Sequence, residues 1–188
     1  MRLVIENLEE ELSEWLFLEY RHAAEIWNGA LFTNVSSRKM AERLSMYGRV
    51  DARPCYEVFR PREAVVLDPK AEKPLRRRDF RGREALIIGG ILGEAVPLGR
   101  TANLITARMR GARIRHLGEV QLTIDSAALV AKLVEMDMSL EEIEITTEVE
   151  VRVSEVESIY LPYGYVVHEG KLILTPGLRE YLLKEHRR

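Results

Sequence analysis

Short apolar runs and helically spaced apolar residues take turns along the first half of the chain. A short run closed by turn residues is typical of a strand buried on both faces, and four such runs lie at residues 3–5, 31–33, 64–67 and 85–88. Helical spacing predicts a helix over residues 12–27, and Ser36 or Ser37 is expected to cap a second helix that ends at Gly48. This alternation indicates an α/β fold with a parallel sheet.

Two of the predicted strands end in glycine-containing loops, and a helix is expected after each. The run at 85–88 leads into residues 89–93, and Thr101 is expected to cap a helix to about Arg110. The run at 113–117 ends at Gly118, and Thr123 or Asp125 caps a helix to about residue 136 that is apolar nearly all round and therefore buried. Because ligands of open parallel sheets bind outside the carboxyl ends of the strands, the two loops predict a ligand crevice.

The last part of the chain predicts strands and one helix. Residues 141–153 alternate between apolar and polar, which predicts a single long strand with one exposed face. Residues 160–167 and 171–174 flank a turn at 168–170, which predicts a hairpin, and a final helix follows Pro176. With 188 residues the chain is expected to form one domain, in which 83–135 binds the ligand and 141–188 supplies terminal strands and a helix.

Composition narrows the protein class. Hydrophobic residues make up 46% and charged residues 31%, and no apolar run approaches the ~20 residues of a membrane span. The N-terminus turns acidic at once, unlike a signal peptide, and the one cysteine, Cys55, excludes an internal disulfide and a cysteine-rich zinc site. The four histidines lack ligand spacing, so no metal site is predicted. We expect a cytoplasmic protein that does not contact membranes.

The net charge of −2 conceals a separation of basic and acidic segments. We call residues 70–83 the basic segment, because it contains Lys70, Lys73, Arg76, Arg77, Arg78, Arg81 and Arg83. A cluster of this kind can attract an anionic partner such as RNA, or it can be a solvated loop. The sequence leaves both interpretations open.

Two common nucleotide-binding templates do not fit the glycines. A dinucleotide fingerprint needs three spaced glycines, and aligning Gly90 and Gly93 with the last two places Ile88 at the first. A P-loop needs Lys followed by Ser or Thr after its glycines, whereas Gly93 is followed by Glu94. An unrelated nucleotide-binding α/β protein is therefore disfavoured.

A broader combination of residues is more informative than the glycines alone. It joins the glycine run at 88–93 and the Arg-Thr pair at 100–101 to residues around a polar loop. Those residues are 115, 117–118, 121, 123, 125 and 127, and later matches lie at 161–163 and 165–166. This combination resembles the SPOUT-class methyltransferases, and most closely a branch with a fungal protein-arginine methyltransferase and archaeal proteins predicted to be RNA methyltransferases. The segment Glu94-Ala95-Val96-Pro97 departs from the Asp-His-Pro-Pro often found there, but it keeps the acid.

The resemblance implies a fold, a cofactor and a set of binding residues. The fold would be a parallel sheet flanked by helices, with a C-terminal trefoil knot and a small appendage of a β-hairpin and a helix. The cofactor would be S-adenosylmethionine (SAM), and no metal would be required. The cofactor-binding residues carried over are Gly89, Gly90, Ile91, Leu92, Gly93, Leu117, Gly118, Gln121, Leu122 and Thr123.

Three residues are candidates for the catalytic step. Glu94 could orient a guanidinium acceptor, and its alternative role is a solvated loop acid. Asp125 could assist it, or could cap the helix that begins nearby. Arg100 could contact phosphates of an RNA acceptor, or could form a salt bridge within its own loop.

The acceptor is expected to belong to the translation machinery. A carboxylate beside the methyl donor repels phosphate and attracts a guanidinium, which favours a protein arginine, such as one of a ribosomal protein. The alternatives are methylation of tRNA or rRNA and a non-catalytic module that binds RNA or the ribosome through the same pocket. The resemblance leaves a monomer and a homodimer open.

Overall fold

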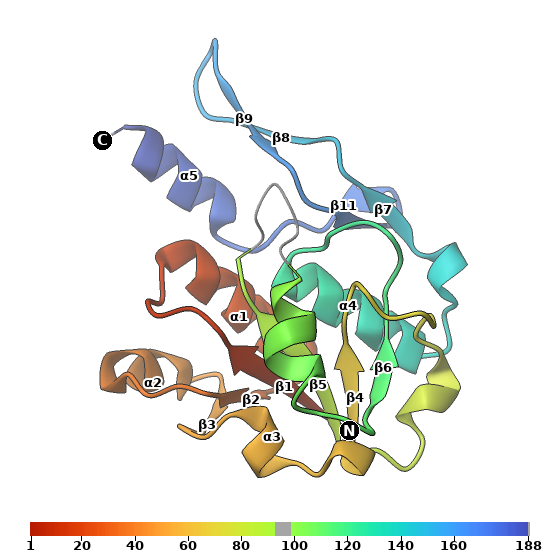
Figure 1. Ribbon diagram of the computed structural model, residues 1–188. Coiled ribbons are helices and arrows are strands. Elements are labelled where there is room, and N and C mark those ends of the chain that lie inside the picture. The colour runs from red at the N-terminus through yellow and green to blue at the C-terminus, as the bar shows by residue number, and fades with distance from the viewer. Residues whose placement is uncertain (93–98, 188) are drawn as a thin grey trace.

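A six-stranded parallel sheet forms the centre of the computed structural model, which describes residues 1–92 and 99–187 (Figure 1). The spatial order is β3-β2-β1-β5-β4-β6. The strands are β1 (Arg2–Asn7), β2 (Ala30–Thr33), β3 (Gly48–Val50), β4 (Ala64–Leu67), β5 (Ala85–Gly90) and β6 (Arg113–Arg115). All five pairings are parallel, so the predicted α/β architecture is confirmed.

The strand order differs from that of a simple dinucleotide-binding fold. In the 3-2-1-4-5-6 order of that fold the fourth strand lies beside the first, whereas here β5 lies between β1 and β4. The connection from β4 to β5 also contacts the chain beyond β6, because the N–H of His116 donates to Lys73 O (3.0 Å) and the N–H of Leu75 donates to His116 O (2.9 Å). The knot remains a prediction, which this order and these contacts support.

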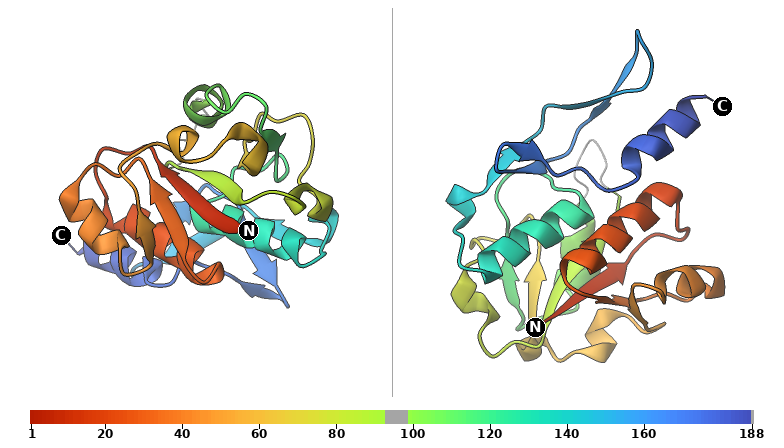
Figure 2. Two further views of the ribbon diagram at one scale, coloured as in Figure 1. Left: turned by 90° about the horizontal axis from the view of Figure 1, so that it is seen from below. Right: turned by 180° about the vertical axis from the view of Figure 1, so that it is seen from behind.

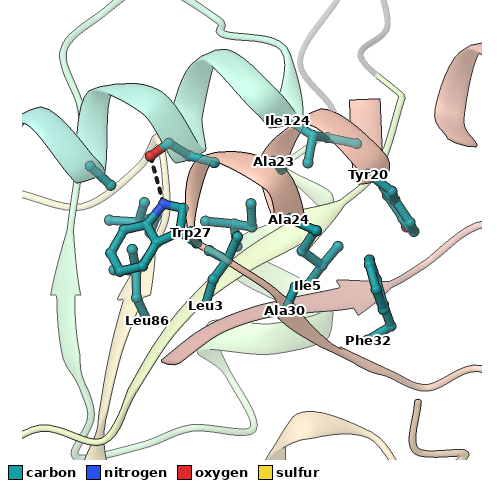
Figure 3. Close-up of a cluster of buried hydrophobic side chains, with 14 of the residues drawn as sticks. Leu3, Ile5, Tyr20, Ala23, Ala24, Trp27, Ala30, Phe32, Leu86 and Ile124 are labelled. Atoms are coloured by element: carbon teal, nitrogen blue, oxygen red, sulfur yellow. Dashed lines mark hydrogen bonds between the residues drawn. The ribbon is translucent and has the colours of Figure 1, made fainter. Parts of the chain in front are cut away.

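Each face of the sheet buries alternate residues of the strands. On one face Leu3, Ile5 and Leu86 pack against α1 (Glu14–Ile26) and α4 (Ile124–Glu135), which lie side by side (Figure 2). Figure 3 shows this cluster, in which the indole N–H of Trp27 donates to the Ala128 carbonyl of α4 (2.9 Å). Each fully buried side chain of this size contributes roughly 1.5–3 kcal/mol.

The opposite face is covered by shorter elements. Val4, Val66 and Ile87 pack against α3 (Cys55–Val58) and the π-helical segment η3 (Ala102–Thr106). Cys55 is fully buried in this layer. The predicted helix from Thr101 to Arg110 is shorter than expected: Arg100 and Thr101 are already helical, Ala102–Thr106 form the π-helical segment, and turns follow. Thr101 makes no capping hydrogen bond, so the predicted cap is wrong.

The remaining short elements connect the sheet to its helices. Ser37 caps α2 (Arg38–Leu44), as predicted, by accepting a hydrogen bond from Met40 N (3.4 Å). Gly48 begins β3. Three 3₁₀ turns complete this part: η1 (Pro61–Glu63), η2 (Arg77–Phe80) and η4 (Leu140–Glu142).

The C-terminal region contains three strand pairings. Its elements are β7 (Glu144–Thr146), β8 (Val149–Arg152), β9 (Ser158–Leu161), β10 (Tyr165–His168), β11 (Lys171–Leu172) and α5 (Leu178–His186). The predicted single strand over 141–153 is wrong, since β7 pairs with β10 and β8 pairs with β9 in another sheet. The Thr146 hydroxyl accepts from the N–H of Glu148 (3.2 Å) between the two, and such local bonds compete with strand pairing. The hairpin at 168–170 is confirmed as β10–β11.

Candidate functional site

A cavity of about 210 Å³ lies where β4 and β5 end and α4 begins. Because both strands are parallel, their carboxyl ends open on the same edge of the sheet, which is where ligands of this architecture bind. Four segments line the cavity: residues 67–70, 88–92, 99–101 and 117–124, together with Ala127, although Gly90 in the second segment does not contribute. Most of the exposed lining is apolar, and a few polar groups converge on it, as is typical of a small-molecule site.

Eight of the ten predicted cofactor-binding residues line this cavity: Gly89, Ile91, Leu92, Leu117, Gly118, Gln121, Leu122 and Thr123. Gly93, like the candidate catalytic residue Glu94, lies outside the described residues. Gly90 is described but faces the core, where a Cβ would come within 2.0 Å of the Tyr20 hydroxyl oxygen. That hydroxyl lies 3.0 Å from the carbonyl of Gly90, so packing accounts for the glycine.

Gly118 is open on the side where a side chain would project. Its φ is +114°, a conformation that other residues adopt only with strain, and a Cβ there would meet nothing within 4 Å. The positive φ therefore accounts for the glycine in this turn, and the space beside it is open; its role in binding the cofactor stays a prediction.

The sequence interpretation missed the segment that follows β4. Leu67, Asp68, Pro69 and Lys70 line the cavity. Asp68 is buried, accepts a hydrogen bond from Lys70 N (2.9 Å) and pairs with the Thr106 hydroxyl (2.6 Å). The signal that could have found this segment is the rule about carboxyl strand ends, but it requires knowing that β4 lies beside β5.

The candidate catalytic residue Arg100 holds the first glycine loop in place. Its guanidinium donates to the Leu92 carbonyl (2.8 Å) and contacts a Glu9 carboxylate oxygen (3.2 Å). The same Glu9 oxygen accepts a hydrogen bond from Leu92 N (3.2 Å). The salt-bridge interpretation of Arg100 thus finds a partner in Glu9, which comes from the N-terminal part of the chain.

The candidate Asp125 lies behind the cavity wall. The side chain of Thr123 caps α4, so the capping role considered for Asp125 is wrong. Asp125 is 2% exposed and is hydrogen-bonded by His22 Nδ1 (2.7 Å), the Thr175 hydroxyl (2.6 Å) and the Thr123 hydroxyl (2.7 Å). It therefore joins α1, the start of α4 and the C-terminal region.

Glu19 of α1 is a second buried acid beside Asp125, and the sequence interpretation missed it. Its carboxylate accepts hydrogen bonds from Ile124 N (3.0 Å) and from the Trp15 indole (2.6 Å). Burial, followed by the charge of Asp125, raises the pKa of Glu19 to about 8. In the sequence, an acid within an amphipathic helix is normally a solvent-facing residue, so no local signal marked it.

The buried hydroxyl of Tyr165 completes this group. It makes no hydrogen bond within the described part of the chain, and burial, with further contributions from Glu19 and Asp125, raises its pKa. We call Glu19, His22, Thr123, Asp125, Thr175 and Tyr165 the buried polar network.

Several cations near the basic segment are engaged within the protein. Asp79 receives two hydrogen bonds from the Arg115 guanidinium (2.8 and 2.9 Å), and Arg113 lies 3.6 Å away. Arg77 pairs with Asp137 (2.6 Å). This part of the surface therefore has a structural role as well as a positive charge.

The described residues also bear on two other kinds of feature, a metal-binding group and a membrane-spanning helix. Within residues 1–92 and 99–187, no three side chains of the metal-binding types gather closely enough to hold an ion. The helices described there are also too short or too polar to cross a membrane.

Comparisons with known proteins agree with this geometry. A family description, "Protein arginine N-methyltransferase SFM1-like", matches residues 2–188. SFM1 of Saccharomyces cerevisiae is 30% identical over 203 residues, covering 98% of this chain and 95% of SFM1.

Solved structures show the same fold. The crystal structure of yeast SFM1 complexed with S-adenosylhomocysteine (SAH) superposes with a TM-score of 0.87 at 27% identity, covering 96% of this chain and 94% of that one. Trm10 of Thermococcus kodakaraensis gives a TM-score of 0.58 at 18% identity, over 75% of this chain and 95% of that one. The second likeness concerns the fold alone, which is that of the SPOUT methyltransferases.

Proposed function

Because the chain belongs to the SFM1-like family of protein arginine N-methyltransferases, we propose that it transfers the methyl group of SAM to an arginine side chain of a protein. One observation carries this proposal: the cavity at the ends of β4 and β5 is lined by eight of the residues that the SPOUT resemblance assigns to the cofactor. Yeast SFM1 has been crystallised with SAM and with SAH.

The cavity suits the parts of this cofactor. Ile88, Leu92, Leu117 and Leu122 supply apolar surface for adenine, and the backbone around Gly118 leaves space beside it. Bound SAM supplies a methyl group on a sulfonium, which a nucleophile attacks in line. The protein's own contribution is to hold the acceptor nitrogen in line and to exclude water.

An arginine acceptor makes a specific demand on the site. A guanidinium has a pKa above ~12 and arrives protonated, so its nitrogen must lose a proton as the methyl group is transferred. A carboxylate can orient the guanidinium and favour that loss. We keep Glu94 as the residue proposed for this role, because it lies in the sequence between Leu92 and Gly99, which both line the cavity.

The arginine interpretation is preferred over RNA for two reasons. The family is described by protein arginine methylation, and Arg100 is engaged by Glu9 and Leu92. A ribosomal protein as the acceptor, a cytoplasmic location and a homodimer remain predictions.

Radioactive methyl transfer tests the proposal. The purified protein is incubated with methyl-labelled SAM and cell extract, and the product is treated with nuclease or protease and then hydrolysed. We expect label that resists nuclease and elutes as methylarginine. Nuclease-sensitive label would show that RNA is the acceptor, and absence of label despite SAM binding would favour a non-catalytic module.

Two variants locate the activity. Glu94→Gln should lower methyl transfer at least tenfold while SAM affinity stays within about twofold, since only the orienting charge is lost. Gly118→Val should lower SAM affinity at least tenfold while circular dichroism shows a folded protein. An active Glu94→Gln variant would contradict the role proposed for this acid.

A further inference from the structure

Two cationic side chains line the cavity within the described residues, and they differ in their contacts. Arg100 is engaged by Glu9 and by the Leu92 carbonyl. Lys70 forms no salt bridge in residues 1–92 and 99–187, and its ammonium lies against Gly99 on the cavity wall. A Cβ on Gly99 would lie 2.5 Å from Lys70 Nζ, so the glycine allows the ammonium to occupy this position.

The turn after β4 fixes the backbone that carries this ammonium. The N–H of Lys70 donates to the buried Asp68 carboxylate (2.9 Å), and the N–H of Ala71 donates to the Asp68 carbonyl (3.0 Å). The other Asp68 oxygen is held by the Thr106 hydroxyl (2.6 Å). The start of the Lys70 side chain is therefore set by a buried residue, although its end is exposed.

We propose that Lys70 binds the α-carboxylate of the methionine portion of SAM. This inference rests on the proposed function, and it assigns part of the same site. The α-carboxylate is the only anionic group of SAM, whereas the sulfonium and the α-ammonium are cationic. An ammonium–carboxylate contact is a charge-assisted hydrogen bond, stronger than a neutral one. Lys70 thus acts as a specificity residue for the amino-acid arm of the cofactor.

Binding of SAH and 5′-methylthioadenosine (MTA) tests the inference by calorimetry. The two compounds share the adenosyl thioether, and MTA lacks the amino-acid arm. Lys70→Ala should weaken SAH binding about tenfold, as expected for loss of one charge-assisted hydrogen bond, and should leave MTA binding within about twofold. Lys70→Arg, which keeps the charge, should recover most of the SAH affinity.

Two controls make the result specific. Lys73→Ala removes a neighbouring exposed lysine that does not line the cavity, and it should leave both affinities unchanged. Decarboxylated SAM keeps the ammonium and the sulfonium, so its affinity should not respond to Lys70→Ala. In methyl transfer, Lys70→Ala should raise the KM for SAM with little change in kcat, because the contact is the same before and during the reaction.

The outcomes are separable from those of the proposed function. Equal weakening of SAH and MTA by Lys70→Ala would overturn the inference, since Lys70 would then shape the cavity as a whole. Unchanged SAH binding would overturn it as well. If the wild-type protein bound neither SAH nor MTA, the cofactor site itself would be wrong and both proposals would fall.

Discussion

Two walls of the cavity at the ends of β4 and β5 are held in different ways. The wall formed by residues 117–124 is fixed from behind by the buried polar network and by Gly164, whose N–H donates to Gln121 O (2.8 Å). The wall formed by the glycine loop after β5 is fixed by Arg100 and Glu9, whose side chains are 28% and 26% exposed. Polar contacts that are fully buried are costly to break, whereas a partly exposed ion pair contributes less. The first wall is therefore held more firmly than the second.

The strongest test of this contrast removes the centre of the buried network. Asp125→Ala should lower the free energy of unfolding by about 3–5 kcal/mol, because His22 and two hydroxyl groups lose a buried partner. Urea unfolding measures the change. Glu135→Ala, on the same helix but in a partly exposed pair with Lys132, should cost under about 1 kcal/mol. Equal losses in the two variants would remove the contrast between the walls.

The pH dependence of stability is the second test of the contrast between the two walls. The folded-state pKa of Glu19 is about 8, above its ordinary value of 4.5, so between these values the folded protein binds more protons than the unfolded chain. The contribution of Glu19 to the free energy of unfolding is fully present below pH 4.5 and is lost as pH rises through about 8. The unfolding free energy should therefore fall over that range by an amount on the order of a few kcal/mol.

Glu19→Gln isolates this group from the rest of the titration. The variant cannot ionise, so the difference in unfolding free energy between wild type and variant should shrink, or favour the variant, as pH rises from 5 to 8. Urea titrations at several pH values provide the measurement. A difference that is constant with pH would mean that Glu19 titrates normally.

The smallest effect is expected at the second wall. Arg100→Ala and Glu9→Ala should each change the free energy of unfolding by no more than about 1 kcal/mol, with a coupling between them of about 0.5 kcal/mol. SAM affinity should fall a few-fold, because the Leu92 backbone loses its anchors. A double-mutant cycle read by urea unfolding and calorimetry measures both. A loss comparable to that of Asp125→Ala would show that this wall is as rigid as the other.

The sequence predicted the parts of the site that local patterns mark. Gly89 and Gly118 follow predicted strands and could be recognised from their position, as could the buried helix α4. Lys70 could not be placed at the cavity, because only the strand order brings β4 beside β5. Its place within the basic segment suggested either a contact with RNA or a solvated loop.

Errors in the fold and the network have the same origin. The alternation over 141–153 is continuous although β7 and β8 belong to different sheets, because period-two patterning does not specify the partner strand. Glu19 and Asp125 meet across 106 positions of sequence, and Gly90 is explained by Tyr20 rather than by a ligand. Such contacts depend on tertiary structure, which a single sequence does not display locally.

The position of β1 has a consequence for the order of folding during synthesis. Its residues Leu3 to Glu6 pair on one side with β2, and Arg2 to Asn7 pair on the other with Ala85 to Gly90 of β5. One edge of the first strand therefore stays without its partner until β5 has left the ribosome, several seconds later at about 5–20 residues per second. During that interval the exposed edge of β1 can pair with another chain, and a chaperone that shields the nascent N-terminal segment should raise the yield of folded protein.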